Sequence, residues 1–519
     1  MKLRKIYTSA GILLLSLFCI GDAVAKDAKF ETGVSFGSTG ADEPYSSLTD
    51  KDGNYYISGM CRGDVEFAGG ATIKGRGGMD AVIVKYDAEL NFLWARAVGG
   101  SKDDTFERIA VTSAGDIVAV GKISGDITID GTDQTLSGTQ STDGCIVVYD
   151  KDGNYKSSAQ IKAAGASLCY SVAVDKSDNI FVTGSTVGAT DFGNEKTVTI
   201  DGSNPGTFLA CYNNSLVCQW AIAGSSPVQS YGWAVNFDKE ENILLTGRFG
   251  TTFTITGTDG EALTTAVGSE SSQDTYVAKL SHEGVGQWIT YVTNSNRIDT
   301  RSIDSDSQGN VYIWGHCQSA VTPEGQSPLG FNGNFDSFLI KYSSAGAYLD
   351  GMNLGGSGRD EAKSLFVDAD DNIYVAGNVN GDGSKGGTAV NMNPRGESKD
   401  YTFKGHDGYV AKYNGSTWEL MQLEKTVTPD NANQHEVAWC VTMSPDYNKV
   451  YVTGYFNNGA TVFDGASLTL PFVQDYDIYT VLYSYTLMVK TKTLEPGVAN
   501  EPYYLSLIHI SEPTRRTPI

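Results

Sequence analysis

Short runs of apolar and β-branched residues recur along the chain, each bounded by Gly, Asn or Asp. One run ends in a glycine every time, as in Gly53-Asn54-Tyr55-Tyr56-Ile57-Ser58-Gly59 and Asp371-Asn372-Ile373-Tyr374-Val375-Ala376-Gly377. Runs of this length and composition predict strands, and the flanking Asn and Gly predict tight turns. The terminal glycines are Gly59, Gly121, Gly184, Gly247, Gly315, Gly377 and Gly454, spaced by 62, 63, 63, 68, 62 and 77 residues. The pattern predicts one unit that occurs seven times.

Each unit contains three further shared runs, so we expect four strands, which we name A to D in chain order. Strand A is a short apolar run such as 171–175, and strand B is the glycine-ended run. Strand C resembles 80–86, and strand D carries a tryptophan (Trp94, Trp220, Trp288 or Trp418). A four-stranded antiparallel sheet cannot bury both faces alone, but sheets packed around an axis can. The sequence therefore predicts an all-β fold, a seven-bladed β-propeller over 26–490. A solenoid, the alternative, usually has shorter repeats and capped ends.

The two ends of the repeat region suggest how the ring closes. Residues 30–38 resemble the D strand at 94–100, while the last unit loses the pattern after its C strand near 478–483. A D strand donated by residues 28–38 would complete the last blade and remove two exposed sheet edges. In the alternative, Thr486-Leu487-Met488-Val489-Lys490 is the last D strand and 28–38 form an extra edge.

The amino end has the features of an export signal. Lys2, Arg4 and Lys5 precede an apolar run at 12–20, and Ala23-Val24-Ala25 provides small residues for cleavage before Lys26. We therefore expect residues 1–25 to be a signal peptide and the protein to be extracellular, at the cell surface or periplasmic. The apolar run is too short for a comfortable membrane span. A lipoprotein anchored through Cys19 is the alternative, but Phe18 is a poor residue before a lipidated cysteine.

The carboxyl end of the chain does not resemble native protein sequence. Residues 505–515, Leu-Ser-Leu-Ile-His-Ile-Ser-Glu-Pro-Thr-Arg, resemble the in-frame translation of a sequencing adapter. We therefore interpret 505–519 as an artefact and the native protein as truncated. Residues 491–504 are then a linker or the start of a lost carboxyl-terminal region.

The order of the repeated motifs resembles the SBBP family of bacterial β-propeller repeats, which is similar in plan to NHL and quinoprotein-type repeats. The resemblance covers about 30–490. It implies a propeller in an extracytoplasmic setting and brings no shared set of catalytic residues. A fold does not by itself specify a function.

The charge of the chain limits its partners. The formal net charge is −23, with 61 acidic and 38 basic residues. Such a surface repels nucleic acid and anionic membranes, so we expect neither as a partner. It does not identify the ligand.

Candidate chemistry is sparse. His282, His316, His406 and His435 lie in different units and in no metal-ligand spacing. The acidic segments 304–310 and 368–372 resemble calcium loops, but 50–54 and 150–154 repeat the pattern, which favours plain A–B turn chemistry. We find no catalytic set, no metal site and no cofactor motif.

Seven cysteines follow the signal peptide, and an odd number leaves at least one thiol free in an exported protein. Cys211 and Cys218 flank the turn at Asn214-Ser215, and we expect them to face each other across a hairpin. They are the candidate disulfide.

These observations favour an exported, non-catalytic binding or scaffold module for a protein or a carbohydrate. Tyr231, Trp233, Trp439 and Tyr476 are candidates for a sugar-stacking platform, with core or inter-blade packing as the simpler interpretation. The alternative is a polysaccharide lyase or hydrolase whose residues meet at the propeller axis. A third possibility is a structural or adhesive part of a longer surface protein. We expect the residues that determine function in the variable B–C segments or in sequence that is missing after residue 504.

Overall fold

The computed structural model describes residues 23–266, 273–380, 388–403, 405–427, 435–457, 460–463 and 466–489. They divide between two compact units. One is Lys29–Ser484, and the other contains the outer ends of the first and last strands, within 1–28 and 485–519. The predicted signal peptide lies outside the described residues except for Ala23–Ala25, which begin the first strand, and 491–519 lie wholly outside them.

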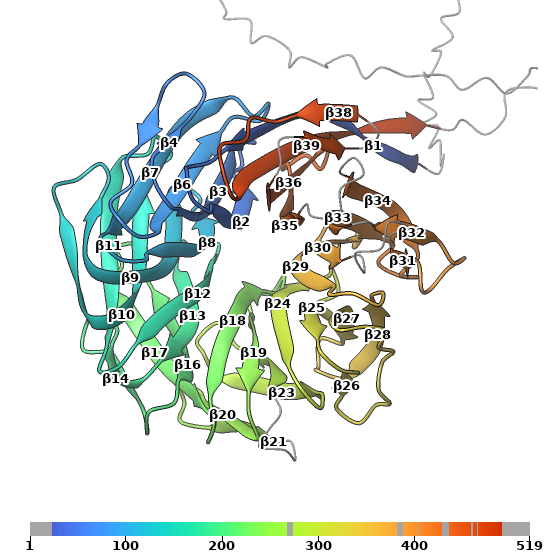
Figure 1. The fold of residues 1–519 in the computed structure, drawn as a ribbon. Helices are drawn as coiled ribbons and strands as arrows, with labels where there is room; N and C mark the ends of the chain where they lie inside the picture. The colour runs from blue at the N-terminus through green and yellow to red at the C-terminus, as the bar shows by residue number, and fades with distance from the viewer. Residues whose placement is uncertain are drawn as a thin grey trace, which may run out of the picture. The chain divides into compact units, whose positions relative to one another are not determined.

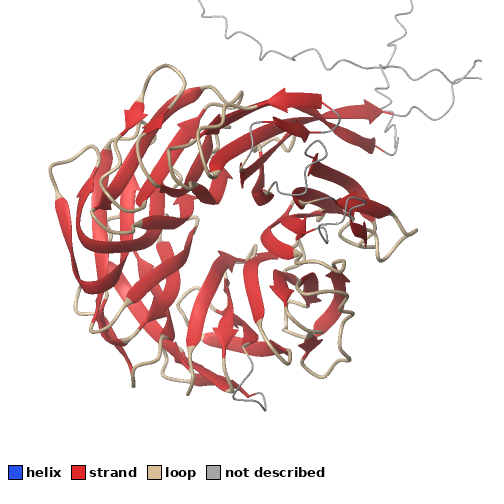
Figure 2. Ribbon diagram, viewed as in Figure 1, coloured by secondary structure: helices blue, strands red, loops and turns tan. Residues whose placement is uncertain are grey.

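The described residues form strands, turns and bends and include no helix (Figure 2). No helix in this part of the chain is therefore long and apolar enough to cross a membrane. The strands form antiparallel sheets in which the predicted A, B, C and D strands of each repeat pair in order. The predicted fold class, an all-β propeller of antiparallel sheets, is confirmed.

The four-stranded sets follow one another along the chain, and every anchor glycine lies in a B strand. The sets are as follows: β2 (Glu43–Thr49), β3 (Tyr55–Cys61), β6 (Asp80–Tyr86), β7 (Phe92–Gly100); β8 (Thr105–Val111), β9 (Ile117–Ile129), β10 (Thr135–Tyr149), β11 (Tyr155–Ala163); β12 (Ser167–Val174), β13 (Ile180–Thr186), β16 (Gly206–Tyr212), β17 (Cys218–Ser225); β18 (Ser230–Phe237), β19 (Ile243–Phe249), β22 (Asp274–Leu280), β23 (Gly286–Thr293); β24 (Ile298–Ser305), β25 (Val311–Cys317), β27 (Asp336–Tyr342), β28 (Tyr348–Leu354); β29 (Glu361–Val367), β30 (Ile373–Asn380), β33 (His406–Tyr413), β34 (Leu420–Val427); β35 (Glu436–Met443), β36 (Lys449–Phe456), β39 (Asp477–Val489), β1 (Ala23–Phe36).

The A strands are innermost and surround a common axis (Figure 1). Each contacts its neighbours in the order β2, β8, β12, β18, β24, β29 and β35, and β35 contacts β2 again. The apolar residues gather between adjacent sheets; one cluster, for example, joins Tyr56 and Ile83 of β3 and β6 to Ile117 and Val147 of β9 and β10. Sheet-on-sheet packing therefore buries the faces that a single sheet would leave exposed.

The N-terminal strand β1 lies at the outer edge of the last set, next to β39, as the donation hypothesis predicts. Phe36 of β1 is 5% exposed and packs in one cluster with Ile57 of β3 and Ile478 of β39. The alternative D strand is not formed, because the described residues 486–489 continue β39 itself.

The variable B–C segments are not simple loops. Several form short hairpins, such as β14 (Gly188–Asp191) with β15 (Thr197–Ile200) and β20 (Thr252–Thr256) with β21 (Ala262–Ala266). β14 pairs with β11 and β20 pairs with β17, the D strands of the preceding sheets. The hairpins therefore cover sheet edges that would otherwise expose unpaired backbone groups.

Candidate axial binding site

Every inner strand contains one β-bulge at the same place. The register between strands A and B shifts by one residue, for example between Pro44 and Ser46 and between Gly232 and Ala234. A bulge places one extra residue in a strand and redirects its side chain. The bulged residues are Tyr45, Glu107, Tyr170, Trp233, Arg301, Lys363 and Trp439.

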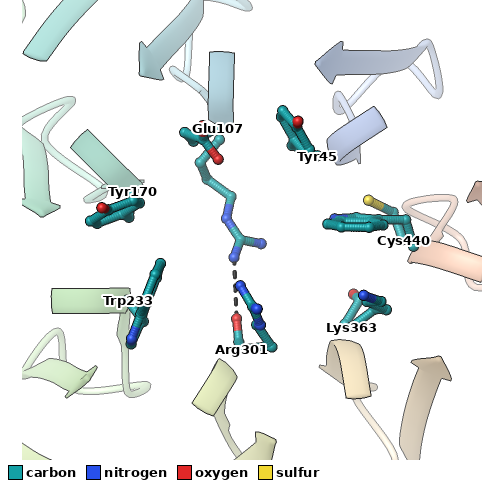
Figure 3. A pocket seen from close by; sticks show the side chains of 10 residues that line it. Tyr45, Glu107, Tyr170, Trp233, Arg301, Lys363 and Cys440 are labelled. Atoms are coloured by element: carbon teal, nitrogen blue, oxygen red, sulfur yellow. Dashed lines mark hydrogen bonds between the residues drawn. The ribbon is translucent and has the colours of Figure 1, made fainter. Parts of the chain in front are cut away.

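These bulged residues line a single pocket, together with Arg108, Ser364 and Cys440. In Figure 3 the labelled side chains surround one space, and successive ones come from successive inner strands. The cavity has a volume of about 60 Å³ and opens to solvent. All the bulged residues are half-buried. The bulges therefore turn one side chain per strand toward the axis.

Aromatic rings form much of the wall. Tyr170 lies against Trp233 with ring centroids 4.4 Å apart, and Tyr45 lies 5.6 Å from Trp439. Tyr231, at the start of β18, stacks on Trp233 at 5.7 Å. Aromatic pairs at these separations stabilise each other, and their remaining faces suit apolar ligand surfaces.

Of the aromatics that the sequence singled out, Trp233 and Trp439 lie in the pocket and Tyr231 supports it. Tyr476 lies farther out, 5.2 Å from Tyr455, whose ring lies 6.0 Å from Trp439. The sequence did not identify Tyr45 or Tyr170. The sequence did contain a signal for them, because Tyr45 and Tyr170 occupy the same position in their A strands as Trp233 and Trp439.

The two bulged cations, Arg301 and Lys363, lie against aromatic rings. Lys363 Nζ lies 2.8 Å from a Glu361 oxygen and 4.1 Å from the centre of the Trp439 ring. Burial lowers the pKa of Lys363, although the Glu361 charge opposes that shift. The guanidinium of Arg301 lies 5.3 Å from the centre of the Trp233 ring and 4.0 Å from Asp299. Cations above aromatic faces are stabilised by the ring quadrupole.

Glu107 is the one carboxylate among the residues that line this pocket. The Thr105 hydroxyl donates a 2.7 Å hydrogen bond to it. Burial raises the pKa of Glu107, and that hydrogen bond and the charges of Lys122, Arg301 and Arg108 oppose the shift. A raised pKa suits a general acid, but glycoside hydrolysis ordinarily needs a second carboxylate across the bond.

A basic cluster surrounds Asp299 at the start of β24, the inner strand that also contains Arg301. Asp299 is fully buried, and Arg297 Nη2 and Arg248 Nη1 lie 2.6 Å and 3.2 Å from its carboxylate oxygens. His316 Nε2 lies 3.6 Å away. Burial favours protonation of Asp299, but the His316 hydrogen bond and the arginine charges outweigh it, so its pKa lies well below the usual range.

The remaining histidines are not brought into this cluster. His406 and His435 stack with ring centroids 4.1 Å apart, and burial followed by the charge of His435 lowers the pKa of His406 to about 4. His282 Nε2 lies 2.6 Å from Asp175, at an A–B turn. In the described residues, no group of three or more His, Cys, Asp or Glu side chains is placed to hold a metal ion.

The acidic turns have structural partners that explain their composition. Asp306 accepts hydrogen bonds from Gln308 N, Asn310 N, Asn310 Nδ2 and the Tyr312 hydroxyl, and Lys341 Nζ lies 3.1 Å away. Asp304 instead accepts a hydrogen bond from Val367 N of the next inner strand at 2.9 Å. The segment 150–154 has the same turn chemistry, but it joins strands C and D, contrary to our expectation of an A–B turn.

The candidate disulfide is not formed. Cys211 and Cys218 are free buried thiols. The register pairs Cys211 with Trp220 and Tyr212 with Cys218, across a register shift. Cys211 therefore packs in the cluster that contains Phe181, and Cys218 in the cluster on the other face of the sheet. The shift between Cys211 and Tyr212 is the reason that flanking one turn does not bring the thiols together.

Comparisons with known proteins agree with the fold. The model of the SBBP family, described as a beta-propeller repeat, matches residues 158–193. An uncharacterized WD repeat-containing protein of Acanthamoeba polyphaga mimivirus is 21% identical, over 68% of this chain and 31% of its own length. The chain thus spans about a third of the relative that it matches.

Solved structures are similar at low identity. The Dos1 propeller is 9% identical, with 88% of this chain and 95% of that chain covered and a TM-score of 0.37. The periplasmic gluconolactonase PpgL of Pseudomonas aeruginosa is 9% identical, with 88% and 100% covered and a TM-score of 0.35. From its strand pairing and its matching repeat, the chain is a β-propeller repeat protein.

Proposed function

We propose that this protein is an exported, non-catalytic binding module at or outside the cell surface, which takes a carbohydrate in its axial pocket. The observation that carries the proposal is the convergence of one bulged side chain from every inner strand on a single space. Strand packing does not require these residues to be aromatic or charged. Their side chains determine what the axis can bind.

The chemistry of the wall favours a saccharide over a protein segment. Tyr45, Tyr170, Trp233 and Trp439 offer flat faces, and Lys363 and Arg301 provide hydrogen-bond donors around them. Binding sites commonly combine aromatic walls with a few polar groups that fix orientation. The predicted export signal supports an extracytoplasmic role, where glycans are abundant.

Binding of an oligosaccharide panel to the full chain, measured by calorimetry, tests the proposal. We expect Trp233→Ala and Trp439→Ala each to weaken binding by about tenfold, the equivalent of 1.4 kcal/mol. The matched control is Tyr447→Ala, because Tyr447 is 42% exposed at an A–B turn outside the pocket. Oligosaccharide binding that neither tryptophan variant weakens would contradict the axial site.

The same experiment distinguishes the non-catalytic binding module from the enzyme alternative. Glu107 is the observation that favours it, because a half-buried carboxyl with a raised pKa can act as a general acid. Shortened products that disappear in Glu107→Gln would replace the binding proposal with a polysaccharide lyase or hydrolase. Unchanged oligosaccharides at saturating protein support the non-catalytic module.

A further inference from the structure

The axial pocket contains two half-buried arginines, Arg108 and Arg301, and one carboxylate, Glu107, whose charge acts on both. Lys363 is paired with Glu361 at 2.8 Å, but Arg108 has no carboxylate within 4.0 Å among the described residues. Its Nη2 donates a hydrogen bond of 3.4 Å to the Arg301 carbonyl oxygen, marked by the dashed line in Figure 3.

Arg301, like Arg108, has no carboxylate at hydrogen-bond distance among the described residues. Its nearest carboxylate is Asp299 at 4.0 Å, and Arg297 and Arg248 hold that carboxylate at shorter distances. In the described part of the chain, the Arg301 side chain makes no hydrogen bond, and the Nε atoms of both Arg108 and Arg301 are buried without a partner. Two guanidinium groups thus meet at the axis with most of their donors unused.

The other repeats show that the fold does not need an arginine at position 108. Each residue that follows a bulge occupies the equivalent place: Ser46, Arg108, Ser171, Ala234, Ser302, Ser364 and Cys440. Every residue in this set except Arg108 is small. Ser46 and Ser171 accept hydrogen bonds from backbone N–H groups of the next inner strand, of Ile109 and Val235. Arg108 therefore departs from the structural pattern of the repeat, as expected of a functional residue.

We infer that Arg108 and Arg301 form the receptor for a carboxylate group on the bound saccharide, so that the ligand is an acidic sugar such as a uronate. This inference rests on the proposed function and specifies its ligand class. The planar guanidinium matches a carboxylate with paired hydrogen bonds. The Trp233 ring, which lies 5.3 Å from the Arg301 guanidinium, borders the same space.

The charge of the whole chain limits the density of negative charge on the ligand. A net charge of −23 repels polyanions at a distance. A saccharide with one carboxylate per ring experiences this repulsion weakly and still gains the local attraction of the two arginines. Densely sulfated or phosphorylated polymers are therefore disfavoured.

Calorimetry on the full chain with uronate trisaccharides and their methyl esters tests the inference, because each pair differs in charge and little else. We expect the wild type to bind at least one acid about tenfold or more tightly than its ester. Arg108→Ser, which installs the serine that other repeats carry, and Arg301→Gln should each remove this preference while binding of the ester is unchanged. Arg62→Gln, at an exposed position outside the pocket, is the matched control.

The outcomes distinguish the two proposals. Equal binding of acid and ester, with both weakened by Trp233→Ala, overturns the carboxylate receptor and leaves the axial binding module intact. A preference for the acid that persists in both arginine variants also overturns it. Trisaccharide binding that Trp233→Ala does not weaken contradicts the axial site itself.

Discussion

At the scale of single residues, packing constrains the side chains at the axis less than the side chains within the sheets. A bulged residue has no opposite partner in the ladder, so strand packing places few demands on its side chain. The axial positions consequently vary between aromatic, acidic and basic residues, while the flanking Ser46 and Ser171 are used for contacts between blades. In the proposed axial site, the bulged residues, together with Arg108, therefore determine recognition.

Buried carboxyls just before the inner strands make stability depend on pH. Asp104 and Asp360 are at most 1% exposed, and burial raises the pKa of each to about 7, against two accepted backbone hydrogen bonds. A folded pKa above the unfolded value near 3.8 means that the folded state binds the proton more tightly. The stability contributed by each protonated carboxyl is complete below about pH 4 and is lost as the pH rises toward 7.

We therefore expect the free energy of unfolding to fall between pH 5 and pH 7, by about 1.4 kcal/mol per pH unit for each carboxyl. Denaturant titrations at several pH values measure this slope. Asp360→Asn should reduce the slope by the share of one group, whatever its effect on stability at a single pH. A slope that is the same in Asp360→Asn and the wild type would contradict the assignment.

At the scale of elements, the B–C hairpins protect the edges of the preceding sheets. Gly224 of β17 pairs with Ile255 of β20, whose own repeat follows in the sequence. Phe253 of the same hairpin is fully buried and stacks on Tyr276 with ring centroids 3.9 Å apart. The hairpin is thus fixed to its own sheet by aromatic packing and to the neighbouring sheet by backbone hydrogen bonds.

Phe253→Ala should lower the free energy of unfolding by about 3–5 kcal/mol, the usual cost of removing a buried phenylalanine. It should also promote aggregation, because the edge of β17 loses its cover. Chemical denaturation and light scattering measure the two effects. Thr264→Ala, an exposed change in the same hairpin, should stay within about 0.5 kcal/mol of the wild type. Comparable losses in both variants would show that the hairpin is not fixed through Phe253.

At the scale of the whole molecule, ring closure depends on the pairing of the two ends of the repeat region. β1 completes the sheet of β35, β36 and β39, and Phe30 lies edge-on to Tyr483 with ring centroids 6.1 Å apart. Without β1, the outer edge of β39 and the apolar side chains around Phe36 would be exposed. An N-terminal strand therefore joins the last sheet to the first.

Deletion of residues 1–38 should abolish a single cooperative thermal transition, whereas deletion of residues 1–22, which leaves β1 whole, should preserve it. Circular dichroism during heating measures the transition. A synthetic peptide of residues 23–38 added to the shorter chain should restore part of the lost stability, since it supplies the missing strand. Identical melting of the two deletion variants would contradict closure through β1.

The amino-acid sequence by itself determined the strands, the turns and the order in which they pair. Each anchor run, such as 53–59, combines β-branched or aromatic residues with a tight turn, and both signals depend on neighbouring residues alone. The repetition of the unit then determined the propeller, because single sheets of this kind must pack on one another.

Only the tertiary structure decided which side chains of those strands point toward the axis. The bulges shift the register by one residue, which turns Tyr45 and Arg301 to the axis and places Cys211 and Cys218 on opposite faces of a sheet. A one-residue shift leaves the composition of a strand unchanged, so the sequence pattern does not reveal it. The proposed axial site lies outside the variable B–C segments, where we expected the residues that determine function. That pocket is assembled from inner strands of successive repeats, and its positive charge results from residues as far apart in sequence as Arg108 and Arg301.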